Sequence, residues 1–225
     1  MNFLQLVQEF RRQARISGTG PSSVVSQTGN MQLAVNWILQ AYEDIQNLHT
    51  DWMFLENDFS FNTIASTQNY TSTSISLSEF GEWKTNSFRY YLASTGSSGE
   101  QWLPHLRYEK FRDWYLFGPA RTQTGQPHRF TVVPDLSLSI FPLPDAIYTV
   151  VGRYYKKPQT MTANADIPII PVKYHMIIVY RAMMHYGGWD VANEIFSRGQ
   201  NEYMTLLNKL ERTQLPKMQK AGPLA

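Results

Sequence analysis

The five histidines are the side chains of this chain best suited to bind a metal ion or to transfer protons near neutral pH. They are His49, His105, His128, His175 and His185, and the sequence contains no cysteine. No two histidines stand four residues apart, which is the spacing of helical zinc sites. We therefore expect polar or capping roles for them and predict no metal site.

Motifs for nucleophilic or nucleotide chemistry are missing as well. The sequence has no Gly-x-Ser-x-Gly elbow, Walker motif or dinucleotide fingerprint. The glycine-rich segment from Ser17 to Ser23 lacks the lysine of a phosphate-binding loop, so it reads as a connector. The acidic pairs Glu43–Asp44 and Glu79–Glu82 are typical of solvated surfaces. We predict no catalytic residue, no cofactor and no enzymatic activity.

Composition sets the remaining bounds. Of 225 residues, 43% are hydrophobic and 14% aromatic, which is enough for a packed core. Twenty basic and 18 acidic residues give a net charge of +2, too little for a dedicated nucleic-acid binder. The start of the chain lacks the apolar core of a secretory signal, and the longest apolar run contains Arg181. We therefore expect no membrane contact.

Two amphipathic helices are expected near the start of the chain, because apolar residues recur there at helical spacing. The first stripe is Phe3, Leu6, Val7, Phe10 and Ala14, and the second is Ala34, Trp37, Ile38, Ala41, Ile45 and Leu48. Thr28 and Asn30 are candidate N-caps for the second helix. Trp37 and Trp52 are expected to be core anchors.

The middle of the chain alternates apolar and polar residues, which predicts half-buried antiparallel strands. The expected strands are 59–62, 74–78, 88–92, 128–133, 136–140 and 147–151. A short helix is predicted at 108–115. Exposed loops are predicted around residues 95–99 and 122–127.

Two further helices are expected near the end of the chain. The first carries a stripe from Met176 to Gly187 and is predicted to break at Gly187–Gly188. Asp190 is the expected N-cap of the second, and Pro216 its stop. The predicted fold is α+β, with a four-helix bundle formed by the N- and C-terminal helix pairs and an inserted antiparallel β-rich subdomain. The predicted boundaries are 1–56 and 161–213 for the helices, 57–160 for the insertion and 214–225 for an extended arm.

The segment from Phe141 to Tyr180 carries the most informative pattern. A turn at residues 141–146 leads into a strand, 147–151, that runs on into Tyr154–Pro158. A helix is expected from Val172 to Tyr180, directly after Pro171. This pattern resembles the head-to-tail adaptor (connector, head-completion) proteins of tailed bacteriophages, with Ile170 in place of the leucine usual there. The likeness extends to the first fifty residues and to the final helix pair. The middle, roughly Asn57 to Arg129, carries no matching motif.

The resemblance implies a structural protein in the neck of a virion, made in the host cytoplasm. About a dozen copies, as a dodecamer, would form a ring that joins the portal protein of the head to a tail protein (nozzle or tube). The ring would line part of the DNA channel and contact packaged double-stranded DNA without reading its sequence. A tail-terminator or minor tail protein is an alternative. A soluble enzyme or carbohydrate-binding module is an alternative of a different class.

Two sets of residues are candidates for partner binding. Arg212, Lys217, Lys220 and Leu224 form the predicted portal-binding arm, because residues 212–225 carry three cations and no acid. The loops Ser94–Glu100 and Arg121–His128 are the predicted tail contacts.

Overall fold

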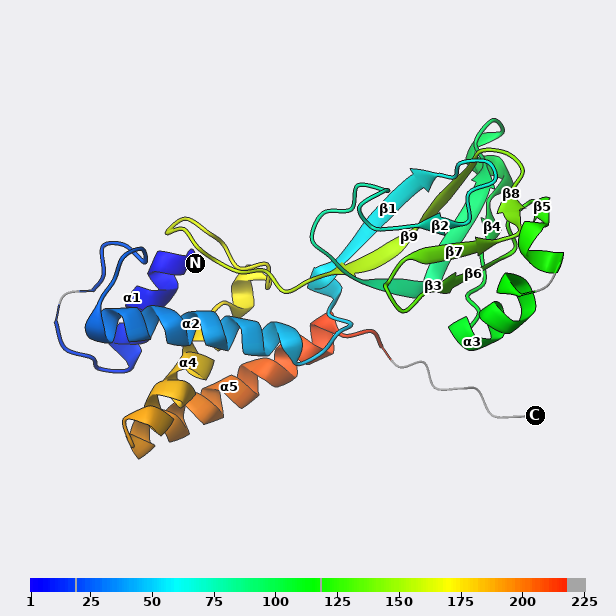
Figure 1. Cartoon of the computed structure of the whole chain (residues 1–225). Coiled ribbons are helices and arrows are strands. Elements are labelled where there is room, and N and C mark those ends of the chain that lie inside the picture. Colours follow the sequence, from blue (N-terminus) through cyan, green and yellow to red (C-terminus); the bar gives the residue numbers. More distant parts are fainter. Residues whose placement is uncertain (19, 118, 218–225) are drawn as a thin grey trace, which may run out of the picture. The chain divides into compact units, whose positions relative to one another are not determined.

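The computed structural model describes residues 1–18, 20–117 and 119–217. The chain divides into two compact units, residues 1–55 with 158–225 and residues 56–157. The fold is α+β, as expected, with five α-helices in the described residues and mainly antiparallel sheets. Figure 1 shows the helices of the first unit and the strands of the second.

The helical unit contains four of the α-helices. They are α1 (Phe3–Gln13), α2 (Gly29–Asn47), α4 (Met176–Trp189) and α5 (Asn193–Gln214). The predicted apolar stripe of α1 is buried throughout, and Asn2 caps this helix by accepting a hydrogen bond from the Gln5 amide. Helix α4 packs against α1, α2 and α5, so it is central to the core of this unit.

Helices α4 and α5 approach each other closely at two glycines. A Cβ atom on Gly187 would lie 2.8 Å from the Phe196 backbone nitrogen, and one on Gly199 would lie 3.0 Å from the Tyr180 carbonyl oxygen. Because glycine has no side chain, the backbones of α4 and α5 can pack directly against each other at these two positions. This contact explains why the predicted break at Gly187–Gly188 is wrong: Gly187 serves packing, and α4 continues to Trp189.

The predicted capping of α5 by Asp190 is also wrong. Ala192 is the N-cap of α5, without a side-chain hydrogen bond. The Asp190 carboxylate instead accepts a hydrogen bond of 2.8 Å from the Tyr186 hydroxyl, back along α4. Thr28 does precede α2, although its side chain makes no capping hydrogen bond.

The β unit contains three sheets and a short helical segment. Its elements are β1 (Glu56–Asn62), β2 (Asn69–Tyr70), β3 (Phe80–Leu92), β4 (Gln101–Trp102), α3 (Tyr108–Phe111), β5 (Thr124–Gly125), β6 (Arg129–Val132), β7 (Leu138–Phe141), β8 (Leu143–Pro144) and β9 (Tyr148–Lys156). The sheet orders are β1-β9-β3-β4, β2-β7-β6 and β5-β8. In the described part of these sheets β5 and β8 pair parallel and the other strands antiparallel. The first and last strands of the unit, β1 and β9, are neighbours, with Glu56 opposite Tyr155.

Aromatic side chains dominate the core of the β unit. Rings from different strands meet there, including the stacked pair Phe88–Phe130 at 4.1 Å between centroids and the edge-on pair Phe59–Phe88 at 5.0 Å. Gly152 leaves room for this packing, because a Cβ there would lie 2.9 Å from the Phe59 ring. The core thus consists of the side chains on the inward face of each strand, which are every second residue along it.

One predicted strand, 74–78, is absent. The segment forms turns, and Ser76 has a positive φ of 57°. The reason is local, since the side chains of Thr71 and Ser74 each accept a hydrogen bond from the other's backbone amide. Serine and threonine hydroxyls can compete in this way with the ladder of a strand.

Candidate interaction surfaces

A patch of unpaired cations lies at the C-terminal end of the helical unit, around Tyr174. The Tyr174 hydroxyl donates a hydrogen bond of 3.1 Å to the Lys209 carbonyl and lies 3.0 Å from the Thr213 hydroxyl. Lys173 places its ammonium 4.9 Å from the centre of the Tyr174 ring. The hydrogen bond with Thr213 and the charges of Lys173 and Lys209 lower the pKa of Tyr174.

Arg212 belongs to the same patch, because it lies three residues after Lys209 on α5 and therefore on the same side of the helix. We call Lys173, Lys209 and Arg212 the basic patch. None of the three has a carboxylate partner among the described residues. Like charges gathered without counter-charges favour an anionic partner.

The predicted portal-binding arm is only partly described. Arg212 lies in the last turn of α5, so it is part of the helix and not of an extended arm. Lys217 follows the helix end. Lys220 and Leu224 lie outside the described residues.

The two predicted tail-contact loops both belong to the β unit, and their neighbouring residues meet. Ser94–Glu100 contains a short 3₁₀ turn, and Glu100 lies 3.7 Å from Arg89. Arg121–His128 contains β5 and ends at His128, whose ring packs against Phe141 at 5.5 Å. Gln126 in the second loop donates a hydrogen bond of 3.4 Å to Gln101, the residue after the first loop.

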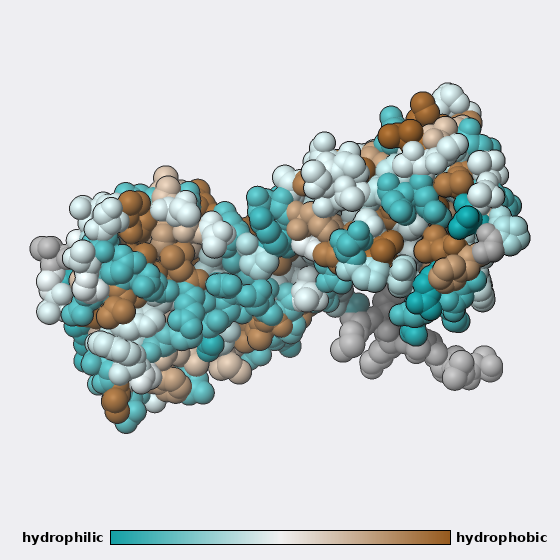
Figure 2. Space-filling view, in the orientation of Figure 1, coloured by the Kyte–Doolittle hydropathy of each residue, from teal (hydrophilic) through white to brown (hydrophobic). Residues whose placement is uncertain are grey.

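Exposed aromatic side chains near these loops were not singled out from the sequence. Trp102, Trp114 and Phe117 are 58%, 58% and 63% exposed. Trp114 lies on a π-helical turn, Arg112–Leu116, and Arg89 stacks 4.5 Å from the centre of the Trp102 ring. Large exposed aromatics are typical of protein–protein contacts. On the face shown in Figure 2, hydrophobic residues are scattered among polar ones in both units.

The outer face of the four-stranded sheet holds a network of ion pairs. Glu56 accepts from Lys84 at 2.6 Å and from Arg153 at 2.8 Å, and Arg153 also donates to Asp58 at 3.0 Å. A shallow groove of about 660 Å³ lies over these residues and reaches Trp102. Each cation on this face is matched by a carboxylate, so the groove has no excess charge to attract DNA.

A second hollow lies in the helical unit, between the end of α1, the start of α2 and the end of α4. Its volume is about 340 Å³. The rings of Trp37, Tyr186 and Trp189 form one wall, and the Asp190 carboxylate lies beside them. We call this hollow the aromatic–carboxylate pocket.

The histidines have structural partners. His175 is buried, its Nε2 lies 2.9 Å from the Ile170 carbonyl oxygen, and burial lowers its pKa. His185 and Arg181 both contact Asp44 on α2, and His49 contacts Glu211 on α5. Burial also lowers the pKa of His105 and of His128. Within the described ranges, no three His, Asp or Glu side chains are grouped to hold a metal ion.

Unpaired cations and exposed aromatic side chains are typical of proteins that assemble with other macromolecules. The family model of the SU10 adaptor proteins matches residues 1–224, and the chain belongs to this family. It is therefore a structural adaptor protein of a bacteriophage virion, in a family that is not one of enzymes. A comparison with curated proteins finds no match. In the part of the chain that the structure describes, no helix has the length and apolar character to cross a membrane.

The basic patch, apart from Arg212, and the aromatic–carboxylate pocket were also not predicted from the sequence. The basic patch combines Lys173, just before α4, with Lys209 and Arg212, 36 and 39 residues later, so only folding brings it together. The aromatic–carboxylate pocket draws on three helices. One hint for the pocket was present in the sequence, since Trp189 lies at the end of α4 and directly precedes Asp190.

Proposed function

We propose that this chain forms the adaptor ring between the portal vertex of the head and the tail. In this proposal about twelve copies surround a channel for double-stranded DNA. The helical unit of each copy is a four-helix bundle, and these bundles lie side by side around the channel. The β units contact the tail through the loops 94–100 and 121–128. The match of residues 1–224 to an adaptor family is the observation that carries the proposal.

Lys209 and Arg212 of the basic patch, with the residues that follow α5, are the proposed portal contact. Neither cation has a counter-charge among the described residues, so an acidic surface on the portal can bind them without first breaking an ion pair. The arm residues Lys217, Lys220 and Leu224 extend this contact along the chain. Contacts with the packaged DNA are non-specific and weaken with salt.

Assembly is tested by measuring the mass of the purified chain by light scattering, alone and mixed with the portal ring of the same virus. We expect the 26.0 kDa chain to join the portal in equal numbers. A stable small species that never associates with the portal contradicts the proposal.

Deletion of residues 214–225, and separately the double change Lys209→Gln and Arg212→Gln, tests the portal contact. Both variants should keep the circular dichroism of the full chain and lose portal binding. Lys110→Gln is the matched control, because Lys110 is also exposed and without an ion pair in the described part, but lies in the β unit. Unchanged portal binding of both variants refutes this assignment.

A further inference from the structure

The aromatic–carboxylate pocket has the chemistry of a site for a basic side chain. Trp37 contacts Tyr186 at 5.3 Å and Trp189 at 5.5 Å between ring centroids, and Trp189 is 60% exposed. One oxygen of Asp190, Oδ2, accepts the hydrogen bond from Tyr186. Its other oxygen, Oδ1, has no hydrogen-bond partner among the described residues, so it is available to a second donor.

Aromatic faces beside a carboxylate favour a cation on an apolar stem, because the rings attract the charge and pack against the stem. Arg15 also lines the pocket, but its guanidinium lies 3.8 Å from Glu194, which offsets its charge. The pocket is therefore suited to a lysine or arginine side chain preceded by an apolar residue.

The turn before α4 presents such a pair. Val172 is 71% exposed, and Lys173 beside it is exposed and has no carboxylate partner among the described residues. Both ends of the turn are anchored, since Ile170 is 1% and Tyr174 5% exposed and His175 contacts the Ile170 carbonyl at 2.9 Å. A protrusion held in this way loses little conformational entropy when it binds.

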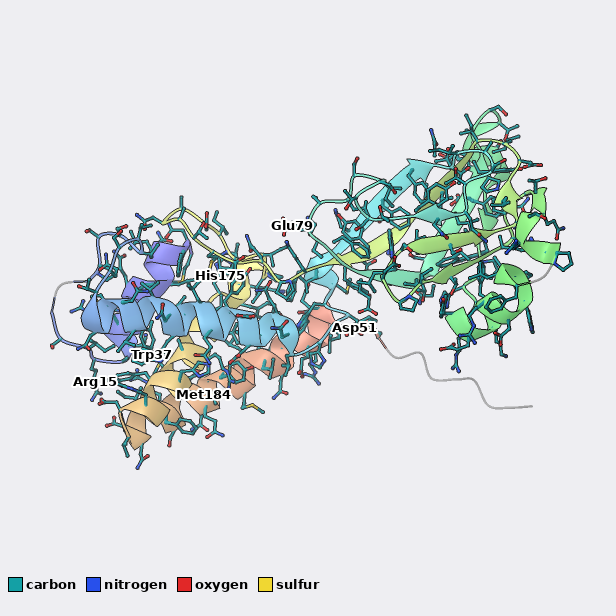
Figure 3. The ribbon with its side chains drawn as sticks, in the orientation of Figure 1. Arg15, Trp37, Asp51, Glu79, His175 and Met184 are labelled. Atoms are coloured by element: carbon teal, nitrogen blue, oxygen red, sulfur yellow. The ribbon has the colours of Figure 1, made fainter. Side chains whose placement is uncertain are left out.

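The turn and the pocket of one chain cannot meet each other. Lys173 precedes α4 and Asp190 follows it, and a helix of 14 residues is about 21 Å long. Figure 3 agrees, with Trp37 labelled toward one end of the helical unit and His175 away from it. The complementary surfaces therefore fit a head-to-tail contact between copies, which closes into a ring when the rotation allows.

We propose that the aromatic–carboxylate pocket of one copy binds the Val172–Lys173 turn of the next copy. This inference rests on the proposed ring and names the contact that joins its subunits. The Lys173 ammonium pairs with Asp190, and the Val172 side chain packs against the Trp189 ring. Because each copy carries both surfaces, the contact repeats around the ring.

Engineered disulfides test this pairing, since the chain has no cysteine of its own. The double variant Lys173→Cys, Asp190→Cys is oxidised and separated by size under denaturing conditions. We expect a ladder of covalent trimers and larger species, because each copy can be linked to two neighbours. Each single-cysteine variant can give at most a dimer. The pair Lys110→Cys, Asp190→Cys is the control and should give no ladder, because Lys110 is also exposed but belongs to the β unit.

A charge exchange provides a second test that needs no oxidation. Lys173→Asp and Asp190→Lys alone should each weaken self-association at least tenfold, and the double exchange should restore it. The assembly mass of the unmodified chain, with and without portal, is measured in parallel. If rings form but no disulfide ladder appears and the double exchange does not restore self-association, then the pairing of Lys173 with Asp190 is wrong and the proposed ring is retained. If neither rings nor ladder form, both the pairing and the ring are refuted.

Discussion

The helical unit and the β unit of this chain reach a packed core by different means. In the helical unit, helices approach until backbone meets backbone, at Gly187 and Gly199. In the β unit, the space between sheets is filled with large rings such as Phe59, Phe88 and Phe130. The α4–α5 contact therefore depends on side chains that are absent, whereas the packing between the sheets depends on side chains that are large. Opposite kinds of substitution should damage these two contacts.

Removing a ring from the β unit should have the largest effect. Phe130→Ala deletes a fully buried ring stacked on Phe88 and is expected to destabilise the β unit by about 3–5 kcal/mol. Urea unfolding followed by tryptophan fluorescence measures the loss. Phe117→Ala, at a ring that is 63% exposed, is the control and should change stability by less than about 0.5 kcal/mol. Equal effects of the two changes would mean that stacking is not what holds this core.

Adding one methyl group should damage the helical unit. Gly187→Ala places a Cβ within 2.8 Å of the α5 backbone and is expected to cost about 1–3 kcal/mol. Gly188→Ala is a control one residue away, where a Cβ meets no atom within 4 Å. It should stabilise α4 by about 0.5–1 kcal/mol, because alanine favours helix. Thermal unfolding by circular dichroism at 222 nm distinguishes the opposite signs.

Acid should weaken both units through histidines whose pKa is lowered. Loss of solvation lowers the folded-state pKa of the buried His175 in the helical unit and of the more exposed His105 and His128 in the β unit. Protonation therefore favours the unfolded chain. The stabilisation is present above the ordinary histidine pKa of about 6.5 and is lost as the pH falls below it.

His175→Gln sharpens this comparison, because it removes the buried histidine of the helical unit and leaves the β unit unchanged. Unfolding free energies at pH 7.5 and 5.5 should differ less in the variant than in the parent chain. Each titrating histidine contributes at most about 1.4 kcal/mol per pH unit. An unchanged pH dependence would assign the acid sensitivity to other groups.

The smallest effect is expected at ion pairs. Lys84→Met breaks the 2.6 Å pair with Glu56, whose side chain is only 12% exposed, and should cost about 1 kcal/mol. Lys157→Met breaks a pair with Glu79 in which both side chains are about 60% exposed. Its cost should be near zero and should vanish in added salt.

The sequence was most informative where an element is determined by its own residues. The stripe of α1 and the α+β class followed from periodicity, because burial of one face requires that spacing. The full-length family match confirms the resemblance based on residues 141–180. Segment 74–78 shows the limit of the same rule, since its period of two was real but hydroxyl groups bonded the local backbone instead.

The surfaces were harder to predict because they combine distant residues. Nothing near Lys173 in the sequence indicates that Lys209 lies beside it, and nothing near Trp37 indicates Asp190. Gly187 was read as a helix breaker for the same reason, since its close neighbour, Phe196, belongs to the next helix. Local patterns thus predicted elements, whereas contacts between elements required the structure.

The pairing of β1 with β9 has a consequence for biosynthesis. Helices α1 and α2 leave the ribosome before residues 56–157, and their partners α4 and α5 follow only afterwards. Once β9 pairs with β1, Glu56 lies opposite Tyr155, so a gap of about a hundred residues shrinks to the width of two adjacent strands. The entropic cost of closing that loop has then already been met when α4 emerges. Folding of the nascent β unit therefore brings the chain end that leads to α4 and α5 close to the end of α2.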